Sequence, residues 1–303
     1  MSGESADLDL RGYLAQERVK VEASLGEALI EILPRIPEEF RNALRHGVTS
    51  GGKRLRPILC VAAYRASGGT DDGIYALAVS LELIHAYSLM HDDLPCMDDA
   101  DLRRGEATTH KIHGEAETTV AGALLIPAAA LQAYEGARGI GVPEEICRLL
   151  VEELARASGG GGMVGGQVLD LMGEDQELTA GQLDDLHRRK TGALLRASLR
   201  MGGMAAGATT RELAGLDRYG EAIGLAFQIA DDLLDATSSA AELGKNPSDA
   251  DLGKSTYVSL FGVEEAGRKA REQVATALTA LRDGGLRSPE LEALARYIVE
   301  RNR

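Results

Sequence analysis

Apolar residues recur every three to four positions along most of the chain, a spacing that places them on one face of an α-helix. This pattern predicts helices over residues 9–33, 38–48, 56–66, 74–93, 115–136, 143–158, 163–173, 180–205, 211–236, 263–282 and 290–301. Only the segment YVSLFG, residues 257–262, has the composition of a strand, and it is short and isolated. The pattern therefore predicts an all-α fold.

Turn-forming residues support these boundaries. Pro57, Pro143 and Pro289 lie at the starts of predicted helices, where a missing N–H does no harm. The longest irregular segments, 97–114 and 237–256, are of a length that is often functional in a compact helical domain. Because the chain contains no internal repeat and no linker, we expect one domain over residues 1–303, with about residues 1–8 outside its ordered part.

Composition narrows the class of protein. Hydrophobic residues make up 44% of the chain and aromatic residues 4%, a balance that favours helices packed in a globular core. No run of eighteen apolar residues occurs, so we expect no membrane span, and the N-terminus lacks the pattern of a secretory signal. The formal net charge of −14 disfavours nucleic acid and anionic lipid as partners.

The cysteines and histidines indicate neither a zinc site nor a side-chain nucleophile. Cys60, Cys96 and Cys147 are scattered, without CxxC spacing, and are typical of free thiols in a reducing cytoplasm. His85 lies seven residues before Asp92 on the same predicted helix face, where it is either an ordinary core group or part of a site.

Two acidic clusters lie in apolar surroundings. Asp92 and Asp93 close a long apolar helix, and Asp98 and Asp99 follow; on an ideal helix Asp99 would align with Asp92, although Pro95 disturbs that geometry. The second cluster lies inside the apolar segment IGLAFQIADDLLDA and contains Asp231, Asp232 and Asp235.

Like charges this close repel, and at a helix C-terminus the helix dipole adds to the cost. Cations between the carboxylates remove that cost, and a donor set of oxygens alone selects a hard metal such as Mg²⁺. The alternative is a solvated acidic face, which is how we interpret the Asp pairs at 71–72 and 184–185.

Basic residues occur near both acidic clusters. They are Lys53, Arg54 and Arg56 in GGKRLRP, then Arg103 and Arg104, then Lys190 beside Thr191, and finally Lys245 and Lys254. Lysine and arginine at a helix start form an anion site. Together the acidic and basic clusters predict a site for a metal-bound polyanion.

The motifs DDLPCMD (92–98) with LRRG, and FQIADDLLD (227–235), resemble the two aspartate-rich motifs of the trans-type polyprenyl diphosphate synthases. GGKRLRP, GMVGGQVLDL (162–171), KTGALL and GKST (253–256) stand in the same order as in that family, and within it the chain most resembles the bacterial farnesyl diphosphate synthases. The resemblance covers about residue 40 to the end. It implies a helical bundle around a deep central cavity, cytoplasmic and homodimeric.

The resemblance also implies roles for individual residues. It implies that Mg²⁺ links the allylic diphosphate to Asp92, Asp93, Asp98, Asp231, Asp232 and Asp235. It implies that Arg103, Lys190, Lys245 and Lys254 contact the same diphosphate, and that Lys53, Arg56, His85 and Arg104 hold that of isopentenyl diphosphate. It implies that Thr191 and Gln228 face the developing allylic cation, and that Phe227, Gln167 and Asp170 lie nearby, the last two ordering water at the second motif.

The implied reaction is ionisation of an allylic diphosphate, attack by the double bond of isopentenyl diphosphate, and loss of a proton. Cations stabilise the leaving diphosphate and a dry cavity protects the carbocation, so no side-chain nucleophile is needed. Tyr87 and Ser88 precede Asp92 by about one helical turn and are expected at the cavity floor, where family members that stop at fifteen carbons tend to carry an aromatic residue. The alternatives are a synthase of ten or twenty carbons, a terpene cyclase, a non-catalytic subunit, and a Mg²⁺ phosphohydrolase.

Overall fold

The computed structural model describes residues 8–174, 176–237 and 254–300 of the chain. Its long helices are α1 (Leu10–Ile32), α2 (Glu38–Thr49), α3 (Leu55–Ala66), α4 (Ile74–Asp92), α6 (Glu115–Gly139), α7 (Glu144–Ser158), α8 (Met163–Met172), α10 (Ala193–Ala205), α11 (Thr210–Thr237), α14 (Val263–Gly284) and α15 (Pro289–Glu300). Shorter elements are η1 (Leu33–Arg35), α5 (Thr109–His113), α9 (Ala180–His187), η2 (Arg188–Gly192) and α13 (Tyr257–Phe261), with strands β1 (Leu102–Arg103) and β2 (Glu106–Ala107). The predicted all-α fold class is confirmed.

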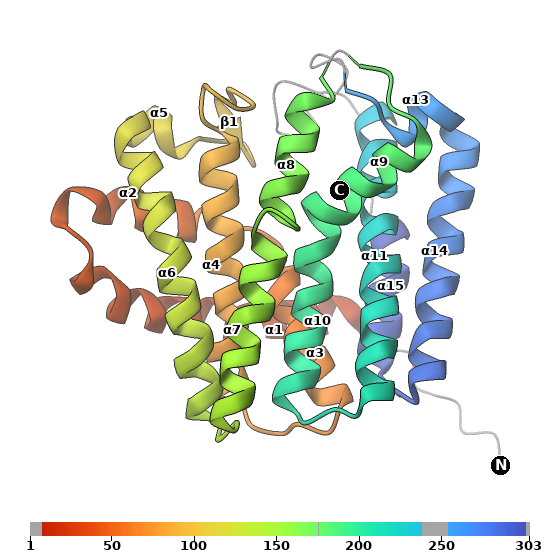
Figure 1. Cartoon of the computed structure of the whole chain (residues 1–303), viewed down its shortest axis with the longest axis horizontal. Helices are drawn as coiled ribbons and strands as arrows, with labels where there is room; N and C mark the ends of the chain where they lie inside the picture. Colours follow the sequence, from red (N-terminus) through yellow and green to blue (C-terminus); the bar gives the residue numbers. More distant parts are fainter. Residues whose placement is uncertain (1–7, 175, 238–253, 301–303) are drawn as a thin grey trace.

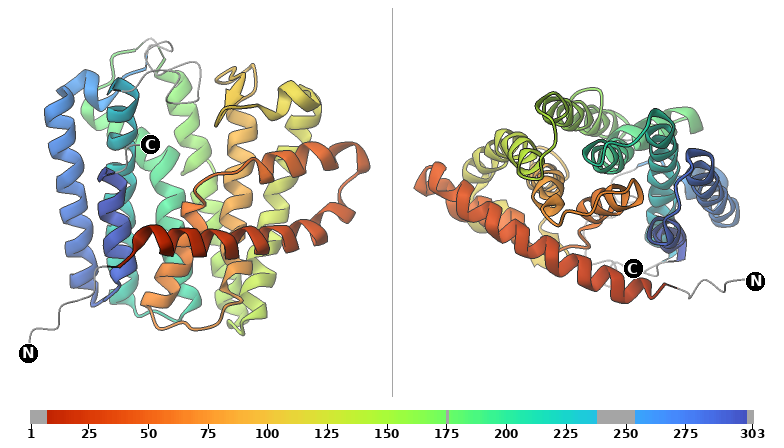
Figure 2. Two further views of the ribbon diagram at one scale, coloured as in Figure 1. Left: turned by 180° about the vertical axis from the view of Figure 1, so that it is seen from behind. Right: turned by 90° about the horizontal axis from the view of Figure 1, so that it is seen from below.

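Most of the long helices stand side by side as an upright bundle (Figure 1). Helix α4 packs along α6, α3 along α10, and α11 along both α10 and α14. Helix α1 lies crosswise over the back of this bundle (Figure 2). The buried core runs through α3, α4 and α10, with Leu59, Leu77 and Leu199 fully covered, and Tyr219 donates its hydroxyl to the carbonyl of Leu291 at 2.7 Å.

The predicted helix over 180–205 is interrupted by a π-helical turn, η2, between α9 and α10. Two glycines of neighbouring helices lie against this turn. A Cβ atom on Gly166 would come within 2.2 Å of the Lys190 backbone nitrogen, and one on Gly224 within 2.8 Å of the Gly192 Cα. Backbone from α8 and α11 therefore encloses the turn directly, and single π turns inside helices are frequent at functional sites.

The strand prediction at 257–262 is wrong. Residues Tyr257–Phe261 form helix α13, which Thr256 begins by accepting a hydrogen bond from the Ser259 N–H while Ser259 reciprocates. This capping box outweighs the β propensity of the tyrosine and valine. The segment 97–114 also contains more structure than predicted, since Gly105, with a φ of 81°, turns β1 back onto β2 and pairs Arg103 with Glu106.

Two described helices, α4 and α6, are long and apolar enough to cross a membrane when judged by length and composition alone. The most apolar stretch of α4 is 67% buried inside the protein, and that of α6 is 39% buried. A core helix packed among its neighbours passes the same criterion, and α4 and α6 pack along each other.

Candidate active site

The first acidic bank, Asp92, Asp93 and Asp98, lies where α4 ends. The chain folds back over the helix terminus, because the Asp98 N–H donates to the Asp92 carbonyl at 2.9 Å and the Ala100 N–H to the Asp93 carbonyl at 3.2 Å. The helix does not continue, so the ideal-helix alignment of Asp99 with Asp92 does not apply. Asp99 is exposed with a φ of 45°, and it is Asp98 that joins Asp92 in lining the cavity described below.

Asp93 is paired with an arginine of the hairpin. Its carboxylate is 3% exposed and accepts hydrogen bonds from Arg103 Nε at 2.8 and 2.9 Å and from Nη2 at 2.5 Å. Burial raises the pKa of Asp93, and the Arg103 guanidinium opposes that rise. Burial also raises the pKa of Asp92 to about 6, with the Lys190 ammonium opposing the rise and Asp98 adding to it.

The second acidic bank, Asp231, Asp232 and Asp235, lies inside the continuous helix α11. Asp232 is 4% exposed, and its Oδ2 accepts a hydrogen bond of 2.7 Å from the Tyr257 N–H, so it also holds the start of α13. Asp231 lines the cavity, and Asp235 follows one helical turn further along α11.

Two residues of each bank line one cavity of about 480 Å³, which we call the polar cavity. The acidic side chains that line it are Asp92, Asp98, Asp170, Asp231 and Asp232, and the basic ones are Arg56, Arg103, Arg104, Lys190 and Lys254, with His85 and His187. Phe227, Gln228 and Thr191 complete the wall near α11. Carboxylates and cations from distant parts of the sequence thus face a common space.

Asp170 of α8 holds two of these cations. Its Oδ2 atom lies 2.6 Å from Lys190 Nζ and 2.8 Å from Lys254 Nζ, and Lys254 also lies 3.5 Å from Asp98 Oδ1. Burial alone would raise the pKa of Asp170, but the two ammonium groups outweigh it and keep the pKa below its usual range. Lys245 lies outside the residues that the structure describes.

The residues of GGKRLRP separate into three environments. Arg56 lines the polar cavity, with its Nε buried and without a hydrogen-bond partner, and burial lowers its pKa to about 10. Lys53 lines a neighbouring cavity of about 190 Å³, which shares Phe227 with the polar cavity. Arg54 is 4% exposed and pairs with acidic residues of other helices.

His85 and Arg104 lie near Arg56. The His85 Nδ1 is buried without a hydrogen-bond partner, and burial, with Arg56 next in size, keeps the pKa of this imidazole well below its usual value. Arg104 donates from Nη1 to the carbonyl of Gly51, which ties the hairpin to residues 51–56. Gly52 is required here, since its φ is 131° and a Cβ atom would lie within 2.7 Å of the Arg104 guanidinium.

Thr191 and Gln228 meet at the π turn. The Thr191 hydroxyl donates to Gln228 Oε1 at 2.8 Å, and Gln228 Nε2 lies 3.5 Å from His187 Nδ1. Gln167 reaches the same region from α8, with both its amide nitrogen and its amide oxygen buried and without hydrogen-bond partners. These polar side chains lie in one region, and the Gln167 amide can still form hydrogen bonds with a further partner.

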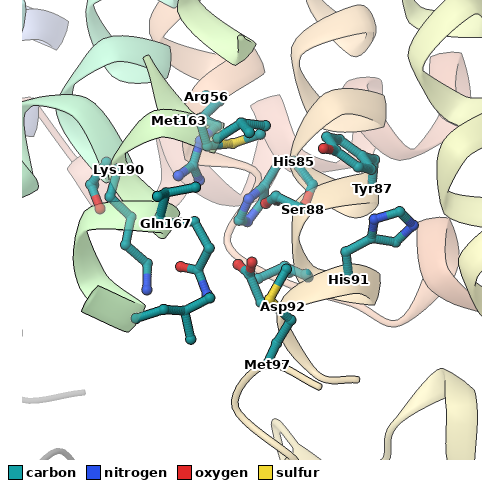
Figure 3. Close-up of a pocket in the computed structure, with 15 residues that line it drawn as sticks. Arg56, His85, Tyr87, Ser88, His91, Asp92, Met97, Met163, Gln167 and Lys190 are labelled. Carbon is teal, nitrogen blue, oxygen red and sulfur yellow. Dashed lines mark hydrogen bonds between the residues drawn. The ribbon is translucent and has the colours of Figure 1, made fainter. Parts of the chain in front are cut away.

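A second cavity of about 180 Å³ adjoins the first, and most of its lining surface is apolar; we call it the apolar cavity. Arg56, His85, Leu89, Asp92, Lys190 and Thr191 line both cavities, whereas Tyr87, Ser88, Met97, Met163, Gln167, Val168 and Leu171 line the apolar one. Figure 3 shows Asp92, His85 and Ser88 along one side of α4, with Tyr87 beyond them beside His91. The Tyr87 and His91 rings meet edge to face at 4.9 Å between centroids.

Sequence reasoning missed two residues of this region. His187 lines the polar cavity, and its ring stacks on that of Tyr257 at 5.7 Å. Glu82 is buried on α4, and its signal was its position three residues before His85, on the same helix face.

Within the described residues, no three acidic, histidine or cysteine side chains lie close enough together to form a metal site by themselves. Of the cysteines, Cys60 and Cys147 are buried free thiols and Cys96 is an exposed one.

Comparison with known proteins gives concordant matches. The model of the family described as Polyprenyl synthetase matches residues 37–285. The chain is 45% identical to a farnesyl diphosphate synthase of Escherichia coli (strain K12) over 91% of this chain and 95% of the relative. It is 39% identical to a chloroplastic geranylgeranyl pyrophosphate synthase of Arabidopsis thaliana, over 97% and 82%.

A solved structure shows the same architecture. The apo crystal structure of an FPP/GFPP synthase from Zymomonas mobilis superposes with a TM-score of 0.81 at 35% sequence identity, and covers 96% of this chain and 99% of the other.

Proposed function

Because this chain belongs to the polyprenyl synthetase family, we propose that it is a trans-prenyltransferase that joins isopentenyl diphosphate to an allylic diphosphate and yields mainly farnesyl diphosphate. The observation that carries this proposal is one polar cavity that is lined by two residues of each acidic bank and by five basic side chains, with an apolar cavity directly beside it. A charged diphosphate and its hydrocarbon chain need that pair of environments together.

The donor set fits Mg²⁺. The acids that line the polar cavity offer only oxygens, which suits a hard cation that takes one or two carboxylates and fills its coordination with water and phosphate oxygens. When bound, Mg²⁺ neutralises the charge that grows on the leaving diphosphate. In this proposal Asp92, Asp98 and Asp231 hold it directly, and Asp93 acts through its pair with Arg103.

The basic residues bind the two diphosphates from the other side. Lys190 and Lys254 exchange their contacts with Asp170 for oxygens of the allylic diphosphate, and Arg103 and Lys245 join them. Arg56, His85 and Arg104, with Lys53 from the adjoining cavity, bind the diphosphate of isopentenyl diphosphate. The unpartnered Nε of Arg56 supports this assignment, because a buried donor without a partner is costly until a ligand satisfies it.

The carbocation formed by ionisation needs stabilisation without a nucleophile. Thr191 and Gln228 present oxygen dipoles at the junction of the two cavities, and the apolar wall excludes water that would otherwise capture the cation. The proton lost after condensation moves to the departing diphosphate, which is the strongest base in contact with the product.

Product length is set in the apolar cavity. We assign Tyr87, with Ser88 beside it, as the floor that stops growth at fifteen carbons. The alternative is a ten- or twenty-carbon product, and the similarity to a geranylgeranyl pyrophosphate synthase keeps the longer product as the second candidate.

We also propose that the enzyme works as a cytoplasmic homodimer. Val120, Pro127 and Leu131 recur along one exposed face of α6, which supports burial of this face against a second copy. Light scattering on the purified protein measures its mass in solution directly.

The experiment that tests the activity incubates purified protein with Mg²⁺, isopentenyl diphosphate and either dimethylallyl or geranyl diphosphate, followed by sizing of the products. Chain growth to fifteen carbons supports the proposal. A cyclic hydrocarbon indicates a terpene cyclase, phosphate release without growth indicates a hydrolase, and no turnover without an added partner protein indicates a non-catalytic subunit.

A further inference from the structure

Arg54 occupies a strained backbone position that its contacts explain. The residue has a φ of 51° and a ψ of 33° at the start of α3, a left-handed conformation that few residues other than glycine adopt. Its guanidinium is buried among three other helices. A strained, buried arginine persists only where the surroundings hold it. These surroundings therefore fix the course of residues 51–56, which comprise the turn before α3 and the first two residues of that helix. We call this segment the basic loop.

The contacts that hold Arg54 come from α1, α2 and α4. Nη1 donates to Glu82 Oε1 at 2.7 Å, Nε donates to Glu22 Oε1 at 2.8 Å, and Nη2 donates to the Val48 carbonyl at 3.1 Å. Glu82 is 3% exposed, whereas the Glu22 side chain is 37% exposed. The ion pair between Arg54 and Glu82 is therefore the desolvated one. Because an uncompensated buried charge is costly, this pair holds the position of the Arg54 guanidinium most strongly.

Glu82 stands on the face of α4 that leads into the site. His85, Leu89 and Asp92 follow it at intervals of three, four and three residues, and all three line both cavities. Glu82 also acts on a second arginine of the loop: burial lowers the pKa of Arg56, and Glu82 is the strongest neighbouring charge that opposes this. One buried carboxylate thus serves both Arg54 and Arg56.

We propose that Glu82 is a positioning residue for the isopentenyl diphosphate subsite, acting through its buried ion pair with Arg54 to hold the basic loop so that Lys53 and Arg56 meet the diphosphate. This inference rests on the proposed function. It gives the three cations of the loop different roles, since Lys53 and Arg56 contact substrate whereas Arg54 anchors them. It also predicts selectivity, because the proposed function assigns the allylic diphosphate to other cations, Lys190 and Lys254.

The test measures KM for each substrate separately in the Glu82→Gln variant, together with kcat and the thermal unfolding temperature. We expect KM for isopentenyl diphosphate to rise at least tenfold and KM for geranyl diphosphate to change less than twofold. Arg54→Lys retains the charge but loses the forked donors, so it should show the same selective rise. If Glu82→Gln fails to fold, Arg54→Lys decides the question.

Glu17→Gln is the matched control. Glu17 is also a buried carboxylate that links α1 to α4, through a 2.6 Å hydrogen bond from the Tyr75 hydroxyl, but it contacts no residue of the basic loop among those described. This control should lower the unfolding temperature without a selective change in KM.

Two outcomes overturn the inference alone: a lowered unfolding temperature of Glu82→Gln with both KM values unchanged, or an equal rise in both. A wild-type protein that does not consume isopentenyl diphosphate overturns the proposed function itself, and the two failures are thereby distinguished.

Discussion

The two acidic banks reach the same cavity through different local structures. The first bank lies at a helix end and in the loop that folds back over it, where Asp98 is placed by the hydrogen bond from its N–H to the Asp92 carbonyl. The second bank lies within the unbroken helix α11, where only the helical spacing separates its members. The folded-back loop brings Asp98 to the cavity beside Asp92, whereas the helical bank reaches it through the neighbouring residues Asp231 and Asp232.

This difference assigns unlike roles to consecutive aspartates. In the first bank Asp92 lines the cavity while Asp93 pairs with Arg103, which itself lines the cavity. In the second bank Asp231 and Asp232 both line the cavity, and Asp232 is also tied to the backbone of Tyr257. In each Asp-Asp pair, the second residue connects the bank to a neighbouring element, Asp93 to the hairpin and Asp232 to α13.

The two helices also differ in how much of the site they serve. Helix α4 contributes Asp92, His85 and Leu89 to both cavities and Tyr87 to the apolar one. Among the described residues, α11 contributes to the polar cavity and not to the apolar one. Charge is thus supplied from both sides, but the control of chain length is expected from α4.

The largest expected effect separates Asp231 from Asp232. Asp231→Asn removes a proposed metal ligand, and we expect kcat/KM to fall on the order of 10³-fold, or about 4 kcal/mol of transition-state stabilisation. Asp232→Asn keeps an oxygen that accepts a hydrogen bond from the Tyr257 N–H, so we expect kcat/KM of this variant to fall less than about tenfold. Steady-state kinetics at saturating Mg²⁺ measures both.

The free energy of unfolding of Asp231 and Asp232 variants complements their kinetics. Asp232→Ala leaves the Tyr257 N–H without its acceptor and should lower the free energy of unfolding by about 1–3 kcal/mol in urea titrations. Asp231→Ala should change it far less. Equal losses of activity in Asp231→Asn and Asp232→Asn would contradict this division of roles and make both residues ligands.

Much of this arrangement was readable from the sequence, and the failures have local causes. Helix positions followed from apolar periodicity, and the apolar frames around Asp92 and Asp231 identified the two banks among several Asp pairs. The π turn at Lys190 was not readable, because it depends on glycines of two other helices, Gly166 and Gly224, approaching from outside the segment. Helix α13 was missed because only the β-prone composition of the segment was considered, and not the capping box that Thr256 and Ser259 form.

The different roles of the residues within each bank could not be predicted from the sequence, for a similar reason. Nothing local distinguishes Asp231 from Asp232, since the distinction arises from α13, which begins 25 residues later. Lys190 and Lys254 likewise share Asp170 only because the fold brings three distant segments together. Spacing along the chain indicates which residues belong to the site, whereas tertiary contacts determine what each of them does.

An intermediate effect tests the folded-back loop of the first bank. Asp98→Asn should lower kcat/KM about 10²-fold, because the Asp98 carboxylate faces the cavity and the Lys254 ammonium. Asp99→Asn should change it less than about twofold, since Asp99 is exposed, and asparagine tolerates the positive φ of this position as well as aspartate does. A continued helix would predict the reverse order, because Asp99 would then align with Asp92. Kinetics of the two variants, with circular dichroism to verify equal folding, therefore decides whether loop or helix geometry places the carboxylate that opposes the second bank.

The variants with the smallest expected effect on rate are compared by the length of their product. They separate the role of α4 from that of α11. Tyr87→Ala removes an aromatic ring from the wall of the apolar cavity, and we expect the main product to lengthen by at least one five-carbon unit. Phe227→Ala, on α11, is the matched control: it removes a ring from the polar cavity and should raise KM while leaving product length unchanged. Chromatography of the dephosphorylated products measures both. An unchanged distribution in Tyr87→Ala would remove Tyr87 from the floor, and a longer product in Phe227→Ala would show that α11 shares in the control of chain length.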